Sequence, residues 1–182
     1  MNVAPPARPR RRGLRGMQLA TAAMLALILV ASYFKGLRPP HAEGDVTGIA
    51  DGDTLRVFVN GQHEKVRLFG IDCPELRQPF GDDAKAFAAE RVKDRTVRLA
   101  VKDKDEYGRL VAEVYYAPAD APQTERCLNE ELVRAGWAWA YRRYSTQYAP
   151  QEEEARAARR GLWKTGNAVP PWEFRLEQND KP

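Results

Sequence analysis

The chain has 182 residues, of which 43% are hydrophobic and 30% are charged, without a repeat or a long low-complexity tract. This composition excludes fibrous and repeat proteins and allows one compact domain after the N-terminal segment. Six of the 29 basic residues lie in residues 1–35, which contain no acid, so the remainder carries 23 basic and 25 acidic residues. Bulk charge therefore gives no argument for nucleic-acid binding by the body of the protein.

The N-terminus has the pattern of a membrane anchor. Five arginines precede an uncharged apolar run from Met17 to Phe34, whose length is near the lower limit for a spanning helix. Because basic residues stay in the cytoplasm, we expect residues 1–16 there, residues 17–35 in the inner membrane and the body in a bacterial periplasm. A cleaved signal peptide is the alternative, and it would leave a periplasmic or secreted protein.

Residues 36–44 contain two consecutive prolines and are expected to form a linker that includes His41. Disulfide bonds are permitted outside the cytoplasm, so Cys73 and Cys127 either form a bridge or remain as two reduced side chains. His63 is expected to be an exposed strand residue.

The body begins with strands. Apolar and polar residues alternate within residues 45–71, and Asn60-Gly61 is a strong two-residue hairpin signal. The return strand should run from His63 to Ile71. A hairpin that turns at this point places residue 53 level with residue 68.

The later elements have clear boundaries in the sequence. We expect helices over Gly81–Lys93, Cys127–Ala135 and Pro150–Arg160, and strands over Thr96–Val101 and Arg109–Tyr116. Trp137–Tyr141 form an apolar, aromatic segment, and residues 167–182 are expected to be a polar, Pro-rich tail. Five strands with helices inserted late favour an α+β, mainly β, fold. The predicted architecture is an OB-type five-stranded barrel with about three helices, within a domain of residues 45–166.

Acidic residues are found at one end of the predicted hairpin. Asp51 and Asp53 flank a glycine before the first strand, and Asp72 follows the second strand. Carboxylates held together repel one another unless a cation lies between them. Hard oxygen ligands favour Ca²⁺ or Mg²⁺ over zinc, although an Asp-Gly turn alone is commonly structural.

Two arginines accompany these acids. Arg67 lies on the return strand, where it is either a counter-ion or a phosphate ligand, and Arg109 begins a strand, where it is either solvated or a second phosphate ligand. Hydrolysis of a phosphodiester needs such parts: a metal for the phosphate oxygen, a base for water and guanidinium groups for the developing charge.

Three separate motifs make the pattern specific. The segments 51–54, 66–75 and 105–109 resemble, in order, spacing and identity, the motifs of the thermonuclease, or staphylococcal nuclease, family. Supporting matches lie at residues 128–138, 141, 161–163 and 171–175. The resemblance covers about residues 45–175.

The resemblance implies an OB-type barrel and a Ca²⁺-dependent nuclease, with Mg²⁺ as the less favoured ion. It implies that Asp53, Asp72 and the backbone carbonyl of Cys73 bind Ca²⁺, with Asp51 in the outer shell. The family commonly has Thr or Ala at the position of Cys73, a change that a carbonyl ligand tolerates. Glu75 resembles the general base or the group that orients water.

The resemblance also assigns the substrate contacts. Arg67 and Arg109 are similar to the pair that binds the phosphate and stabilises its transition state, with in-line attack by water leaving a 3′-phosphate. Tyr141 and Tyr144 resemble rings that lie beside the substrate nucleotide. The implied substrate is DNA or RNA, single-stranded or denatured, and the implied enzyme is a monomer.

A non-catalytic barrel that binds nucleic acid or protein in the cell envelope is the alternative function. A barrel that only binds should have lost an acid or an arginine of this set. Asp53, Asp72, Glu75, Arg67 and Arg109 are all present, which argues for an enzyme. The sequence favours neither DNA over RNA nor internal over terminal cleavage.

Overall fold

The structure, a computed structural model, describes residues 41–179. The predicted cytoplasmic segment 1–16 and the predicted anchor 17–35 lie outside these residues. Within the described range, no helix combines the length and the apolar character that crossing a membrane requires.

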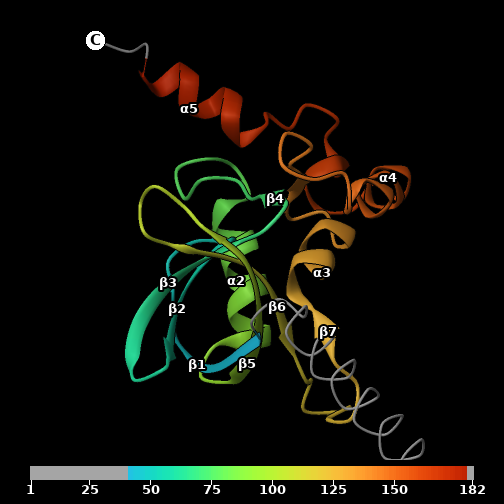
Figure 1. Ribbon diagram of the computed structural model, residues 1–182. Coiled ribbons are helices and arrows are strands. Elements are labelled where there is room, and N and C mark those ends of the chain that lie inside the picture. Colours follow the sequence, from blue (N-terminus) through green and yellow to red (C-terminus); the bar gives the residue numbers. More distant parts are fainter. Residues whose placement is uncertain (1–40, 180–182) are drawn as a thin grey trace, which may run out of the picture. The chain divides into compact units, whose positions relative to one another are not determined.

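Five strands form the centre of the domain. They are β1 (His41–Ile49), β2 (Thr54–Val59), β3 (Gln62–Leu68), β5 (Thr96–Lys104) and β6 (Leu110–Tyr116). Their order is β3-β2-β1-β5-β6, and a parallel pairing of β3 with β6 closes the barrel, whereas the other neighbours are antiparallel (Figure 1). The predicted α+β fold with a five-stranded barrel is confirmed.

The hairpin between β2 and β3 turns where the sequence predicts. Asn60 and Gly61 both have positive φ angles, 52° and 80°, as a two-residue hairpin turn of this kind requires. The Leu68 amide donates to the Asp53 carbonyl oxygen at 2.8 Å. Residues 53 and 68 are therefore level, as expected.

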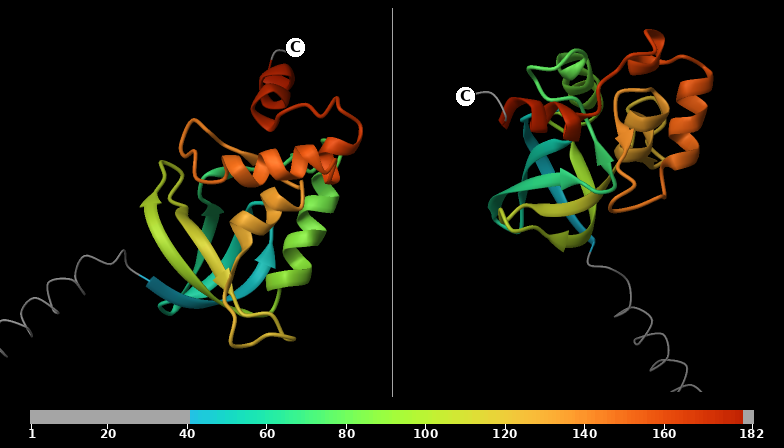
Figure 2. Two further views of the ribbon diagram at one scale, coloured as in Figure 1. Left: turned by 90° about the vertical axis from the view of Figure 1, so that its right-hand side faces the viewer. Right: turned by 90° about the horizontal axis from the view of Figure 1, so that it is seen from above.

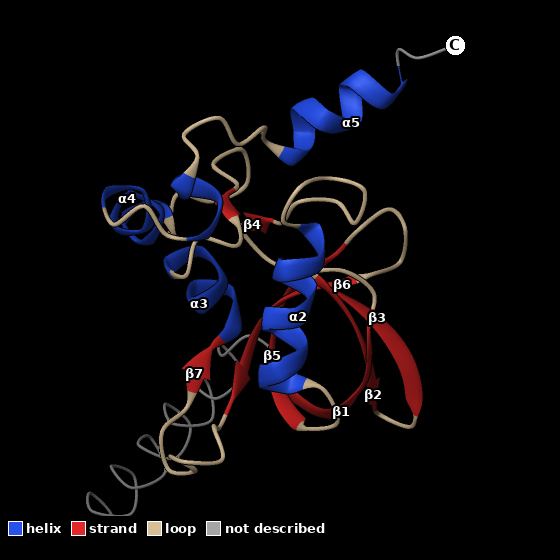
Figure 3. Ribbon diagram, turned by 180° about the vertical axis from the view of Figure 1, so that it is seen from behind, coloured by secondary structure: helices blue, strands red, loops and turns tan. Residues whose placement is uncertain are grey.

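The hydrophobic core fills the barrel and continues under two helices. Helices α2 (Gly81–Val92) and α3 (Leu128–Arg134) lie beside the barrel (Figure 3), and their buried side chains join those of the strands in one cluster. Asn129 of α3 is fully buried. Its side chain bonds to Phe69, Ala112 and Val114 through their backbone groups, which ties α3 to the barrel.

A second, smaller cluster lies near the C-terminal helices. Strand β8 (Trp139–Ala140) pairs with β4 (Ile71–Asp72), and β7 (Arg126–Cys127) extends the edge of β6. Trp139 packs with side chains of α4 (Ala149–Ala157), of the 3₁₀ helix η1 (Gly161–Lys164) and of α5 (Pro171–Asn179). The left view of Figure 2 shows these helices, coloured orange to red, on one side of the barrel.

Two sequence predictions need correction. The linker prediction is wrong for His41–Gly44, because these residues pair with Val97–Ala100 as part of β1. The tail prediction is wrong for Pro171–Asn179, which form α5, so residues 41–179 contain four α-helices rather than about three. A helix with proline at its first position is pre-organised to start there, and Trp172 packs edge-on against Trp139.

The two cysteines are both free thiols, Cys73 buried and Cys127 partly buried. His63 lies exposed on β3, as expected.

Candidate active site

The turn between β1 and β2 is packed tightly against the end of β4. The Asp53 amide donates to Asp51 Oδ1 at 3.1 Å, and the Cys73 amide donates to Asp53 Oδ2 at 2.6 Å. A Cβ atom added at Gly52 would lie 2.8 Å from the Cβ atoms of Cys73 and Ala84. Glycine is therefore required for the two acidic segments to meet.

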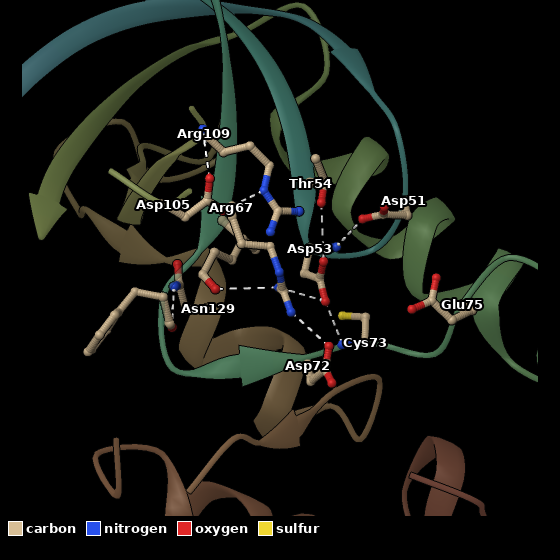
Figure 4. Close-up of polar contacts among 12 residues, drawn as sticks. Asp51, Asp53, Thr54, Arg67, Asp72, Cys73, Glu75, Asp105, Arg109 and Asn129 are labelled. Atoms are coloured by element: carbon tan, nitrogen blue, oxygen red, sulfur yellow. Dashed lines mark hydrogen bonds and ion pairs between the residues drawn. The ribbon is translucent and has the colours of Figure 1, made fainter. Parts of the chain in front are cut away.

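Arg67 joins the two buried aspartates. Its Nη1 lies 2.8 Å from Asp53 Oδ2, and its Nη2 lies 2.7 Å from Asp72 Oδ1. Asp53 and Asp72 are only 6% and 1% exposed. Figure 4 shows the Arg67 guanidinium between the two carboxylates. Burial lowers the pKa of Arg67, but the two aspartates outweigh this effect and raise it, so the arginine stays charged.

Arg109 is held by the turn that precedes it. Asp105 Oδ1 accepts from the Arg109 amide at 2.9 Å, and Asp105 Oδ2 accepts from its Nε at 2.7 Å. Gly108 has a φ of 76°, which closes the turn. The Nη1 and Nη2 groups of Arg109 have no hydrogen-bond partner within residues 41–179, which leaves both available to an anion.

Glu75 follows β4 and meets a residue from the C-terminal helix. Arg175 Nη1 donates to Glu75 Oε1 at 2.7 Å, and Arg175 Nη2 donates to Asp72 Oδ2 at 2.7 Å. The Glu75 side chain is 39% exposed. Its other oxygen, Oε2, has no hydrogen-bond partner among the described residues and is open to solvent.

These groups share one cavity of about 500 Å³. The nine residues that the sequence singles out all line it: Asp51, Asp53, Arg67, Asp72, Cys73, Glu75, Arg109, Tyr141 and Tyr144. The rings of Tyr141 and Tyr144 contact each other edge to face, with centroids 5.0 Å apart. The structure therefore brings every predicted site residue together.

Burial makes the charged form of Asp53 costly. Burial raises the pKa of Asp53 to about 7; Arg67 opposes the rise, and Asp51 and Asp72 add to it. No group of three His, Cys, Asp or Glu side chains within residues 41–179 is arranged to hold a metal. An ion at Asp53 and Asp72 would need backbone or water oxygens as further ligands, which is common for Ca²⁺. Asp53 and Asp72 supply carboxylate oxygens, the type of donor that such an ion takes.

The sequence did not predict a functional role for Arg175, although its side chain lines the cavity. It lies in the segment expected to be a tail, although the same segment belongs to the resemblance at residues 171–175. Consecutive prolines followed by Trp172 are a helix-start signal and could have identified α5. Nothing local in the sequence indicates that Arg175 reaches Asp72.

Comparisons with known proteins agree with this geometry. Residues 65–165 match the family described as staphylococcal nuclease homologue. The chain is 42% identical to Protein ParB of Escherichia coli, over 90% of this chain and 93% of that protein. It is 40% identical to the micrococcal nuclease of Shigella flexneri, over 86% and 90% of the two chains, and 40% identical to an uncharacterized endonuclease of Haemophilus influenzae, over 85% of each. The chain therefore belongs to the staphylococcal nuclease family and is a nuclease, a hydrolase.

Proposed function

We propose that this nuclease is a Ca²⁺-dependent endonuclease that cleaves single-stranded or denatured DNA or RNA and leaves 3′-phosphate ends. One observation carries the proposal: Arg67 bridges Asp53 and Asp72, and the Glu75 and Arg109 side chains line the same cavity. Positive charge at the phosphate and an acid that accepts a proton from water both promote hydrolysis of a phosphodiester, and this cavity contains both.

The acidic side of the cavity would hold the ion. Asp53, Asp72 and the backbone carbonyl of Cys73 are the proposed ligands. Asp51 would act from outside the ligand set, through the hydrogen bond that it accepts from the Asp53 amide. Bound Ca²⁺ would supply positive charge to a phosphate oxygen. Mg²⁺ is the less favoured ion, because it demands near-ideal octahedral geometry.

Side chains of the protein accept the proton and stabilise the charge of the transition state. Glu75 Oε2 is free to accept a proton from water, whose oxygen forms a bond to phosphorus while the bond from phosphorus to the 5′ oxygen breaks in line. The leaving 5′ oxygen takes a proton from solvent. The free Nη groups of Arg109 and the unused N–H groups of Arg67 stabilise the charge on the phosphoryl oxygens.

Tyr141 and Tyr144 are the proposed contacts to the nucleotide. Both line the cavity, and an aromatic face accepts any base, which fits weak sequence preference. We propose that the enzyme acts as a monomer in the periplasm, held at the inner membrane by residues 17–35. The size of the exported protein on a gel tests the anchor, because loss of about 35 residues indicates a cleaved signal peptide.

The test of the activity uses the full chain in detergent, with denatured DNA, in Ca²⁺ and in excess chelator. We expect cleavage in Ca²⁺ only, and a loss of roughly 10²- to 10⁴-fold in Glu75→Gln and Arg109→Ala. Arg56→Ala is the matched control, since Arg56 is exposed on β2 and outside the cavity. Products that a polymerase extends only after phosphatase treatment confirm 3′-phosphate ends.

Equal cleavage by the variants and the wild type would overturn the mechanism. A chain that binds DNA without cutting it under either condition would support the alternative of a binding barrel.

A further inference from the structure

A second cavity adjoins the active site. This cavity, the α5 groove, has a volume of about 870 Å³ and lies between the segment after β8 and helix α5. Its walls include Tyr141, Arg142, Arg143, Arg156, Trp172 and Arg175. Tyr141 and Arg175 also line the catalytic cavity, so the two cavities meet at these side chains.

The α5 groove contains an aromatic platform. The rings of Tyr141 and Trp172 are stacked, with centroids 5.3 Å apart and planes 13° apart, and Trp172 is buttressed edge-on by Trp139. Both rings of the stack are only partly buried. A partly exposed aromatic surface that further rings support is what an unpaired base stacks upon.

The groove is also basic. Arg143 forms no ion pair within the described part of the chain, and Arg142 forms only a long one, 3.8 Å, with Glu153. The one acid in the lining is Glu152, which is buried and already bound by Arg156 and by the Ala140 amide. The groove therefore presents positive charge beside the platform, although the body as a whole is slightly acidic.

We propose that the α5 groove binds the nucleotides of a single strand that flank the cleaved phosphodiester on one side. Bases stack on the Tyr141–Trp172 platform, and backbone phosphates contact Arg142 and Arg143. This inference rests on the proposed nuclease action of the neighbouring cavity. A duplex does not satisfy the groove, because its bases are stacked on one another and do not reach the rings.

Binding and cleavage are measured separately. Binding uses fluorescently labelled oligothymidylates of two to eight residues, the full chain carrying Glu75→Gln, and chelator, so that no strand is cut. Cleavage uses the protein with its catalytic residues intact, in Ca²⁺, and oligothymidylates in which only one linkage is a cleavable phosphodiester. One series is lengthened on the 5′ side of that linkage and another on its 3′ side.

Affinity should rise with the length of the oligomer. In the cleavage experiment, the rate should rise with length in only one of the two series, the one lengthened on the side that the groove binds. Trp172→Ala should weaken binding of the octamer roughly 5- to 150-fold, the range for loss of one stacked base, with a smaller effect on the dimer. Trp172→Phe keeps a ring and should restore most of the gain. Arg143→Ala tests the opposite wall without altering α5, and it should also reduce the salt dependence of binding. Arg56→Ala is the matched control for the lost charge.

The same length-dependent gain in Trp172→Ala and Arg143→Ala as in the parent protein would overturn the inference. A preference for duplex over single strand would overturn it as well. Failure of the proposed catalysis looks different: the oligomers then bind with the expected length dependence, yet none is cut in Ca²⁺.

Discussion

Arg175 and Glu75 lie one hundred positions apart in the chain, yet Arg175 Nη1 donates a 2.7 Å hydrogen bond to Glu75 Oε1. The same guanidinium lies 2.7 Å from Asp72 Oδ2. The last described helix thus supplies a positive charge to two acids of the active site.

This contact predicts competition between Arg175 and the metal. In Arg175→Gln, a cation approaching Asp72 no longer meets a fixed positive charge, so Ca²⁺ should bind roughly 2- to 10-fold more tightly, a modest change because Arg175 is partly exposed. Isothermal titration calorimetry of the metal alone measures it, with Arg56→Gln as the control of equal charge. Weaker Ca²⁺ binding would mean instead that Arg175 holds Asp72 in the geometry that the ion needs.

Asp105 should act by positioning Arg109. Its two oxygens hold the Arg109 amide and Nε, so Asp105→Ala should release the guanidinium and lower kcat roughly 10- to 100-fold. Since both changes act through one group, the double variant with Arg109→Ala should be no slower than Arg109→Ala alone. Steady-state kinetics on denatured DNA gives the comparison. Multiplicative losses would show that Asp105 acts independently of Arg109.

Gly52 should tolerate no side chain. An added methyl group at 2.8 Å from the Cβ atoms of Cys73 and Ala84 overpacks the contact and should cost about 1–3 kcal/mol of unfolding free energy. It should also weaken Ca²⁺ binding, because Asp51 and Asp53 must shift. Gly48→Ala is the control: its nearest neighbour is Arg56 Cδ at 3.7 Å, and it should stay within about 0.5 kcal/mol. Equal stability of both variants in urea would contradict this packing.

Glu113 predicts an acid-sensitive contribution to stability. It is 5% exposed. Burial raises its pKa, but the bonds from Lys102 and Gln147 outweigh burial, so the pKa is lowered. The folded state therefore holds this proton less tightly than the unfolded state. The contribution is complete above the ordinary pKa near 4.5 and is lost as the pH falls through the lower, folded value.

Glu113→Gln should consequently cost about 1.5–3 kcal/mol at neutral pH, and the difference from the wild type should shrink below pH 4.5. Urea unfolding at several pH values measures this difference. Glu43→Gln, at an exposed position of β1, is the control and should show little change at any pH. A penalty that does not vary with pH would indicate a packing role for Glu113.

Local signals made much of the active site predictable. Asn60-Gly61 determines the register of one hairpin, and the register alone places Asp53 beside the strand that leads to Asp72. What the sequence could not indicate depends on contacts between distant segments. His41–Gly44 form a strand because β5 offers them backbone partners, and Arg175 reaches Asp72 because Trp172 packs against Trp139.

Strand β6 pairs with three other strands, and this pairing bears on aggregation. Its first residues, Leu110–Ala112, pair with β3, and its last, Tyr115–Tyr116, pair with β7, while β5 lines the opposite side. Unpaired strand edges are the usual templates for intermolecular β-pairing. β3 closes the ring only along Val66–Leu68, because within the described residues Gln62–Lys65 pair with β2 alone. We therefore expect the edge of β6 to resist pairing with strands of other molecules, and the first half of β3 to be the stretch of the barrel most open to it.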